Sequence, residues 1–220
     1  MEQTLLTKEQ LAALDEIRNS DTIAAIFYLT GGTALSEFYL RHRLSDDLDF
    51  FTDSKEFPQM EIEAIAEKIR TAIGASDINY RRLYDRRIFF LAHNGGELKM
   101  EFTYYPFKAI GERRNVSGTL VDSFEDIVAG KWMALMDRLE PKDFVDFYFI
   151  IKEAGISLGA IRELVNKKFN LKLEASTVGS ELAKVRILDK LPRMIKPLTL
   201  DELKIFFSDQ AKSLDKEIFK

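Results

Sequence analysis

The sequence has no cysteine and only two histidines, His42 and His93, among its 220 residues. Without cysteine, the chain can form no disulfide, no thiolate metal site and no cysteine nucleophile. Two histidines are also too few for a zinc site that is built from several imidazole ligands. The chemistry of the protein must therefore depend on other side chains.

Long apolar runs are missing as well. No uninterrupted apolar segment approaches the ~20 residues that a membrane helix requires. The first ten residues, MEQTLLTKEQ, contain neither a basic segment nor an apolar core, so we expect no signal peptide. We therefore expect a cytoplasmic protein that has no membrane partner. With 46% hydrophobic and 31% charged residues, the composition is that of a globular chain rather than a disordered one.

Charge is distributed unevenly along the chain, whose formal net charge is −4. Residues 161–220 contain 13 Lys and Arg against 9 Asp and Glu, whereas the first 160 residues carry an acidic excess. An acidic body with a mildly basic tail suits a carboxylate metal site beside a surface for a polyanion. Solvated helix surfaces explain the same charges without any function.

Apolar periodicity divides the chain into two lobes, an α+β lobe over residues 1–120 and an all-helical lobe over residues 121–220. In the first lobe the pattern predicts helices over residues 7–18, 33–42 and 58–73, and strands over residues 23–30, 48–52, 78–83, 87–93 and 98–105. In the second lobe it predicts helices over residues 123–138, 141–153, 157–169, 176–188 and 199–218. Capping boxes at Thr7 and Thr199 mark two of the helix starts.

Two aspartates in the stretch Ser45-Asp46-Asp47-Leu48-Asp49-Phe50 fall on one face of a predicted strand. Strand side chains alternate, so Asp47 and Asp49 project to one side while Leu48 and Phe50 point to the core. Two carboxylates about 7 Å apart repel each other unless a cation lies between them. Mg²⁺ prefers such oxygen ligands and keeps positions for water and substrate phosphate. A solvated edge strand is the alternative interpretation.

Glu101 offers a third carboxylate, because it lies opposite the apolar pair Met100 and Phe102 on its own predicted strand. If that strand neighbours the strand of the two aspartates, three carboxylates converge. In that case Glu101 is either a third metal ligand or the base that activates the acceptor hydroxyl. An exposed sheet face has the same alternation, and Asp143 or Asp146 would then supply the third acid.

The pair Gly31-Gly32 ends a predicted strand just before a predicted helix. Such a turn lets backbone N–H groups approach phosphate oxygens, and Thr33 adds a hydroxyl. A glycine pair alone marks many loops. Together with Asp47, Asp49 and a later strand acid, however, it completes the set of groups that metal-assisted nucleotidyl transfer uses.

The order of these motifs resembles the AbiEii/AbiGii toxin family of the polymerase-β-type nucleotidyltransferase superfamily. That family has a GGTAL turn, here residues 31–35, followed by an H-R-x-S-x-D-L-D-F-F stretch, here residues 42–51. A helix with a lysine follows, matched by Lys131, and then an R-D-x-x-D-like helix, matched by residues 142–146 with Lys142 where arginine is usual. The resemblance covers about residues 28–150, and its first two motifs are the specific ones.

The resemblance implies a nucleotidyltransferase-type mixed sheet flanked by helices and followed by a helical lobe. It also implies Mg²⁺, a nucleoside triphosphate (NTP) as substrate, and a toxin with a cognate antitoxin that commonly acts on tRNA. On its matched motifs the resemblance supports NTP binding by Gly31, Gly32, Thr33, Lys131, Asp143 and Asp146. We expect Lys131, Asp47, Asp49 and Glu101 to be the catalytic residues, where Glu101 rests on its strand pattern and not on the resemblance. Without the resemblance, Lys131 would be an ordinary surface lysine, and Asp143 would cap a helix that begins at Pro141.

We therefore expect an Mg²⁺-dependent enzyme that moves a nucleoside monophosphate from an NTP to a hydroxyl acceptor, most simply on RNA or tRNA, with a toxin's effect. The alternatives are nucleotidylation of a small molecule or a protein, and a non-catalytic module that binds a nucleotide or an antitoxin. The basic balance after residue 160 places the expected RNA surface at Lys167, Lys168 and Lys172. The arginine pairs at residues 81–82 and 86–87 are the alternative surface.

Overall fold

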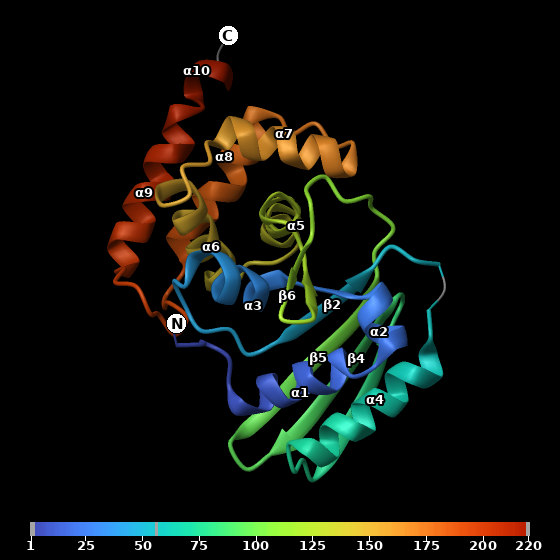
Figure 1. Ribbon diagram of the computed structural model, residues 1–220. Coiled ribbons are helices and arrows are strands. Elements are labelled where there is room, and N and C mark those ends of the chain that lie inside the picture. The colour runs from blue at the N-terminus through green and yellow to red at the C-terminus, as the bar shows by residue number, and fades with distance from the viewer. Residues whose placement is uncertain (1–2, 56, 219–220) are drawn as a thin grey trace. The chain divides into compact units, whose positions relative to one another are not determined.

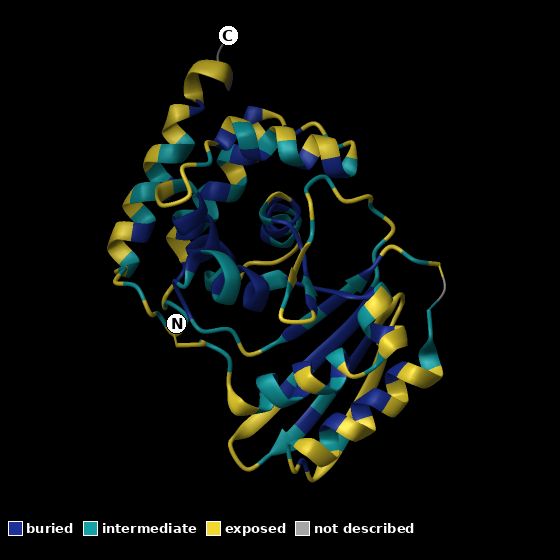
Figure 2. Ribbon diagram, viewed as in Figure 1, coloured by how far each residue is buried: buried dark blue, intermediate teal, exposed yellow. Residues whose placement is uncertain are grey.

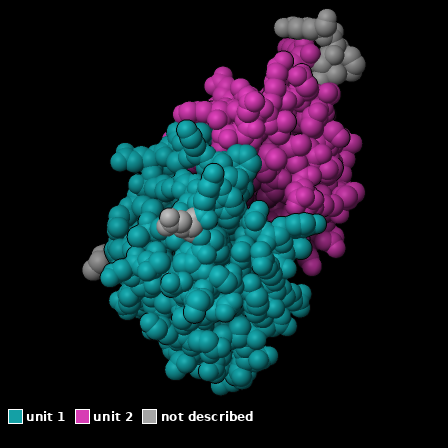
Figure 3. Space-filling view, turned by 90° about the vertical axis from the view of Figure 1, so that its right-hand side faces the viewer, with its two compact units in different colours: residues 1–37, 45–123 teal, residues 38–44, 124–220 magenta. Residues whose placement is uncertain are grey.

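The computed structural model describes residues 3–55 and 57–218 (Figure 1). The chain divides into two compact units, coloured separately in Figure 3. The first unit consists of residues 1–37 and 45–123, and the second consists of residues 38–44 and 124–220. The short segment 38–44 therefore belongs with the helical unit, although the sequence pattern gives no sign of this. The predicted division into domains 1–120 and 121–220 stays a prediction.

A mixed seven-stranded sheet forms the centre of the first unit, in the order β3-β4-β5-β2-β1-β7-β6. Strand β2 pairs in parallel with β5, and β1 with β7, while the other pairs are antiparallel. The predicted α+β class with a mixed sheet is confirmed. The strands are β1 (Tyr28–Thr30), β2 (Leu48–Thr52), β3 (Asp77–Leu83), β4 (Arg86–His93), β5 (Gly96–Tyr104), β6 (Arg114–Val116) and β7 (Thr119–Val121).

Helices α1 and α4 lie side by side over one face of this sheet (Figure 1). That face is apolar: Leu48, Phe50, Met100 and Phe102 are at most 1% exposed, and the strands that carry them are dark in Figure 2. Burial of these side chains supplies the main stabilisation of the unit and leaves the opposite face for polar groups. The helices of this unit are α1 (Lys8–Arg18), α2 (Asp21–Ile26), α3 (Gly31–Leu35) and α4 (Gln59–Ala72).

The described part of the second unit is mainly helical, with a core that includes Trp132, Phe144, Phe147 and Phe207. Segment 42–44 joins this unit through backbone hydrogen bonds to residues 193–196, among them Leu44 N to Arg193 O at 2.8 Å. The helices are α5 (Phe124–Asp137), α6 (Pro141–Lys152), α7 (Leu158–Phe169), α8 (Ala175–Ala183), α9 (Leu200–Ser213) and α10 (Asp215–Ile218). A π-helical turn (Ser36–Leu40) and a 3₁₀ turn (Lys184–Ile187) complete them.

Most predicted elements are present, including both capping boxes at Thr7 and Thr199. The predicted strand 23–30 is wrong in its first half, because Ser20 caps the helix α2 and the strand begins only at Tyr28. The last predicted helix is interrupted at Leu214. Within residues 3–55 and 57–218, no helix combines the length and the apolar character that crossing a membrane requires.

Candidate active site

Asp49 and Glu101 are directly opposite each other on the parallel strands β2 and β5. Their neighbours in the same register, Leu48 with Met100 and Phe50 with Phe102, occupy the buried apolar face. Because strand side chains alternate, the two acids share the other face. The two strands are therefore neighbours, which is the condition that the third carboxylate required. As a result, two of the three proposed ligands lie side by side.

Asp47 comes just before β2 and is held from two sides. The Thr33 hydroxyl donates to the backbone carbonyl of Asp47, and Lys99 Nζ lies 3.2 Å from Asp47 Oδ2. Lys99 Nζ is also 3.9 Å from Glu101 Oε2. One ammonium group thus lies between two of the three carboxylates, and the Thr33 hydroxyl already has a partner within the chain.

Glu101 is a buried carboxylate with a fixed orientation. Arg86 donates to it in bidentate fashion, with Nε–Oε1 and Nη2–Oε2 distances of 2.6 Å, and Thr103 Oγ1 donates at 2.7 Å. A bidentate guanidinium pair is among the stronger and more directional ion pairs. Sequence reasoning missed Arg86 and Lys99 as partners of these acids. For Lys99, its place two residues before Glu101 on one strand face was an available signal.

Gly31 lies against Asp49 where β1 passes into α3. Its φ angle is +72°, and an added Cβ atom would stand only 3.1 Å from Asp49 Cγ. Thr30, the residue before it, is opposite Asp49 in the β1–β2 register. Both the backbone conformation and the space therefore require glycine, which explains why a Gly-Gly turn accompanies this aspartate.

The chemistry of the donors fits a divalent metal such as Mg²⁺, which prefers carboxylate oxygens. Over the described ranges, however, no three acidic or histidine side chains are gathered closely enough to form a ready-made metal site. Lys99 and Arg86 supply positive charge to the carboxylates instead. Metal ligation by Asp47, Asp49 and Glu101 therefore stays a prediction.

The remaining predicted site residues lie in the second unit, where Asp146 is the centre of a buried ionic network. Arg43 donates from Nε at 2.6 Å and from Nη2 at 2.9 Å, His42 Nε2 lies at 2.7 Å, and Lys131 Nζ at 2.6 Å. Burial alone would raise the pKa of Asp146, but the charges of Arg43 and Lys131 and the hydrogen bonds hold it well below its usual value. Asp146 is therefore ionised at neutral pH.

Asp143 extends the same network by one helical turn. It is 3.3 Å from Lys131 Nζ and accepts from Arg138 Nε at 2.9 Å and Nη2 at 3.3 Å. The structure thus brings Lys131, Asp143 and Asp146 together, with the Lys131 side chain only 7% exposed. The two aspartates contact the lysine directly, and their part in NTP binding stays a prediction. Contact between Lys131 and a triphosphate stays a prediction.

His42 is completely buried beside the Phe149 ring. Burial lowers its pKa, against the raising effect of the hydrogen bond and charge of Asp146. The neutral imidazole therefore donates from Nε2 to Asp146. Its Nδ1 atom is buried and has no hydrogen-bond partner among the residues that the structure describes. Its position in a buried network indicates a structural role for this histidine.

Lys168, the second of the three lysines in the predicted RNA surface, does not belong to the surface of the helical unit. Lys168 is buried and its ammonium forms an ion pair with Asp126, which ties α7 to α5. Lys172, by contrast, is well exposed. The expectation that Lys168 contacts RNA is therefore wrong, because its charge is already compensated inside the unit.

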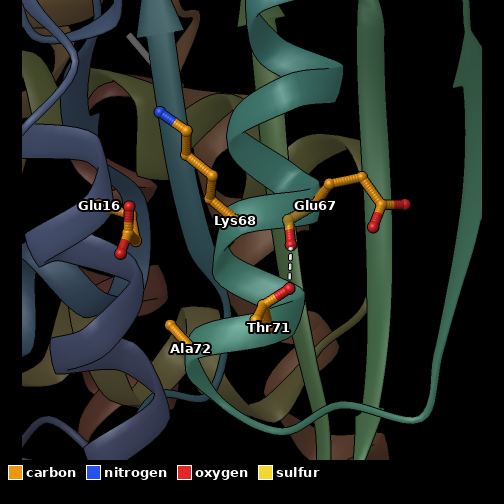
Figure 4. Close-up of a pocket in the computed structure, with 5 residues that line it drawn as sticks. All are labelled: Glu16, Glu67, Lys68, Thr71 and Ala72. Carbon is orange, nitrogen blue, oxygen red and sulfur yellow. Dashed lines mark hydrogen bonds between the residues drawn. The ribbon is translucent and has the colours of Figure 1, made fainter.

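A shallow depression of about 440 Å³ lies between α1 and α4 (Figure 4). None of its lining residues belongs to the predicted site, and they come from helices on the other side of the sheet from Asp49. They are Glu16, Glu67, Lys68, Thr71 and Ala72. Ordinary helix-surface side chains of this kind do not indicate a site.

Comparison with known proteins decides the identity. Residues 13–219 match the family described as the nucleotidyl transferase AbiEii toxin of type IV toxin–antitoxin systems. The chain belongs to this family. The AbiEii chain is accordingly a nucleotidyltransferase, as the resemblance of residues 31–35 and 42–51 implied.

Individual proteins are also similar to this chain. An uncharacterized protein of Aquifex aeolicus (strain VF5) is 34% identical over 168 residues, which are 74% of this chain and 76% of the relative. The crystal structure of JHP933 from Helicobacter pylori is similar with a TM-score of 0.59 at 22% identity, over 96% of this chain and 90% of the other. A candidate nucleotidyltransferase from H. pylori gives 0.60 at 20% identity, over 96% and 97%. At these identities the two solved structures support the fold alone.

Proposed function

We propose that this AbiEii chain transfers a nucleoside monophosphate from an NTP to a hydroxyl group of RNA, and that this activity makes it the toxin of a toxin–antitoxin pair. One observation carries the proposal. Asp49 and Glu101 lie side by side on the polar sheet face, and Asp49 is packed against the Gly31 turn. Carboxylates beside a glycine turn are what a phosphate-transfer site requires.

In this proposal Asp47 and Asp49 would hold the divalent metal, and Glu101 would be either its third ligand or the base that activates the acceptor hydroxyl. When bound, the metal neutralises the triphosphate and activates the attacking oxygen. The acceptor oxygen forms a bond to the α-phosphorus, the bond from that phosphorus to the bridging oxygen breaks, and pyrophosphate leaves. The hydroxyl proton passes to Glu101 or to solvent. Gly31, Gly32 and Thr33 form the turn next to the phosphates.

Lys131 supplies positive charge to the triphosphate in this proposal, and Asp143 and Asp146 position its ammonium group. The antitoxin partner rests on the family, whose description includes a type IV toxin–antitoxin system. The RNA acceptor rests on exposed basic side chains, because phosphodiester chains bind where Lys and Arg are exposed.

Transfer of label tests the proposal. The protein is incubated with Mg²⁺, total tRNA and each of the four NTPs in turn, labelled at the α-phosphate, and an Asp49→Asn variant serves as the control. We expect label on tRNA with the wild type and its loss in the variant. Label on protein or on a small molecule would show that the acceptor is not RNA. The absence of transfer with every NTP would contradict the proposal.

A further inference from the structure

The hairpin of β3 and β4 ends in an unusual turn. Two residues, Tyr84 and Asp85, connect the strands, and Tyr84 has a φ of +51°. Positive φ favours glycine or asparagine and is strained for a bulky aromatic residue. The Tyr84 side chain is nevertheless 87% exposed, so packing does not offset the strain. A strained aromatic residue that contributes nothing to a core points to a surface function.

Positive charge surrounds this tip. Arg81 and Arg82 are exposed on the edge strand β3, and the Arg81 guanidinium lies 5.1 Å from the centre of the Phe90 ring. Arg86 begins β4 and is 44% exposed while it holds Glu101. Glu101 compensates Arg86, so Arg81 and Arg82 against the single acid Asp85 give the tip its basic balance in a chain whose net charge is −4.

The tip is also continuous with the candidate active site. Arg86 is two residues from Tyr84, about 7 Å along an extended chain, and its guanidinium is 2.6 Å from Glu101. The Arg81 side chain shares the sheet face of Glu101, because Arg81 is opposite Ile88 and Ile88 is opposite Glu101. A molecule that is bound at the tip would therefore be separated from the carboxylate face only by the side chain of Arg86.

We propose that residues 81–86 bind the single-stranded end of the RNA acceptor, with an unpaired base stacked on Tyr84 and phosphates neutralised by Arg81 on the Glu101 face and by Arg82 on the opposite face of the hairpin. This inference rests on the proposed function and names its acceptor surface. An exposed ring among arginines is the combination that single strands recognise, since every base has a face to stack and every linkage carries a charge. A protein partner is less well matched to an exposed ring in a basic segment, and it becomes an outcome of the test.

Fluorescence anisotropy of a short labelled single-stranded RNA tests the proposal without NTP or metal. Tyr84→Ala should weaken binding roughly 5- to 150-fold, the range for loss of one stacked base, whereas Tyr84→Phe should bind as the wild type does. The salt dependence separates the two contributions. Tyr84→Ala should leave its slope unchanged, while Arg81→Gln and Arg82→Gln should each reduce it by about 0.7.

Two further variants make the result specific. Tyr84→Asn removes the ring but suits a positive φ, so we expect weaker RNA binding together with an unchanged or higher melting temperature. A variant in which Lys167 and Lys172 become Gln removes charge from the alternative surface of the helical unit. It should bind RNA as the wild type does.

The outcomes distinguish this inference from the proposed function. Unchanged RNA binding in Tyr84→Ala, no RNA binding by the wild type, or loss in the Lys167 and Lys172 variant would overturn the hairpin surface, even if tRNA is labelled in the transfer assay. If Tyr84→Ala still binds RNA but no longer binds a protein partner, the inference is also overturned. If Tyr84→Ala specifically loses RNA binding but the wild type transfers no nucleotide, the hairpin surface is kept and the proposed reaction is rejected.

Discussion

The short distance between Gly31 and Asp49 restricts which residues can occupy these two positions. The Asp49 carboxylate occupies the space that a Cβ atom at position 31 would need, and the positive φ of Gly31 excludes most other residues on its own. In the proposed function a phosphate oxygen approaches the backbone of this turn, where Gly31 itself carries no side chain. One small residue therefore serves both the fold and the proposed chemistry.

Glu101 is the residue at which substitution best separates substrate binding from transfer. Glu101→Gln keeps the shape of the side chain, but it removes the charge that Arg86 and Thr103 now fix. We expect Mg²⁺·NTP affinity, measured by calorimetry, to stay within a few-fold of the wild type. Transfer should fall by roughly 10²–10⁴-fold, as for loss of a base, or further if a metal ligand is lost. Full transfer by the variant would show that Glu101 is only part of the sheet surface.

Lys99 competes with any cation for Asp47 and Glu101, because its ammonium lies 3.2 Å and 3.9 Å from their oxygens. Lys99→Gln should therefore raise the affinity for Mn²⁺ or Mg²⁺ roughly 5-fold, corresponding to about 1 kcal/mol for a solvated charge at 4 Å. Isothermal titration with the metal alone measures this change. Lys68→Gln on α4 is the matched control and should have no effect. Equal metal affinity in all three proteins would argue against ligation by these acids.

At the scale of elements, local patterns predicted which helices and strands exist. Capping boxes fixed the starts at Thr7 and Thr199, and alternation placed Asp49 on the polar side of β2. Alternation also predicted the sheet face on which Glu101 lies, but it could not predict that Asp49 is directly opposite Glu101. The order of strands in a sheet depends on contacts between distant segments, which no local pattern contains.

The same limit applies to the partners of the site acids. The pairing of Arg86 with Glu101 follows from a hairpin register across 15 residues, and the pairing of Arg43 with Asp146 spans 103 residues. The sequence motif contained His42 and Arg43 but gave no indication that they reach α6. Lys168 shows the converse error, because a lysine in a basic segment was taken for surface although Asp126 binds it in the interior.

The buried network around α6 allows a stability test. Asp146→Asn leaves Arg43 and Lys131 without the carboxylate that compensates them, so unfolding free energy should fall by about 3–5 kcal/mol, as for other broken buried pairs. Asp143→Asn should cost less, since its partner Arg138 is 44% exposed and can be hydrated. Urea denaturation of both variants measures the difference. Equal losses would show that Asp146 is not the centre of the network.

His42 adds a pH dependence to the same elements. Burial lowers its pKa in the folded state, while the unfolded value is about 6.5. The unfolded chain therefore binds the proton more readily, and stability should decrease as pH falls below about 6.5. Asp146, Arg43 and Lys131 surround the ring, and the lowered pKa of Asp146 keeps it ionised through this window.

Melting temperatures between about pH 8 and pH 5 test this dependence. His42→Gln, which can still donate to Asp146, should lack the decrease that begins near pH 6.5. His93→Gln is the control because it removes the other histidine of the chain, and it should keep that decrease. A decrease of the same size in His42→Gln would assign the titration to other groups.

At the scale of the whole molecule, the predicted site residues fall into two groups. Asp47, Asp49, Glu101 and the glycine turn belong to the first unit, whereas Lys131, Asp143 and Asp146 belong to the second. That both groups serve one reaction is what the resemblance of the sequence motifs implies, and it stays a prediction. Within their units, the first group presents carboxylates held by cations, and the second presents a lysine held by carboxylates.

The central claim is that Asp49 and its neighbours bind a metal–NTP complex, and calorimetry of NTP with and without Mg²⁺ tests it most directly. Asp49→Asn keeps the shape beside Gly31 and removes the charge. Asp46→Asn changes the exposed acid three residues earlier and serves as the matched control. We expect Mg²⁺ to strengthen NTP binding in the wild type and in Asp46→Asn but not in Asp49→Asn. Equal metal-dependent affinity in all three proteins would contradict the account.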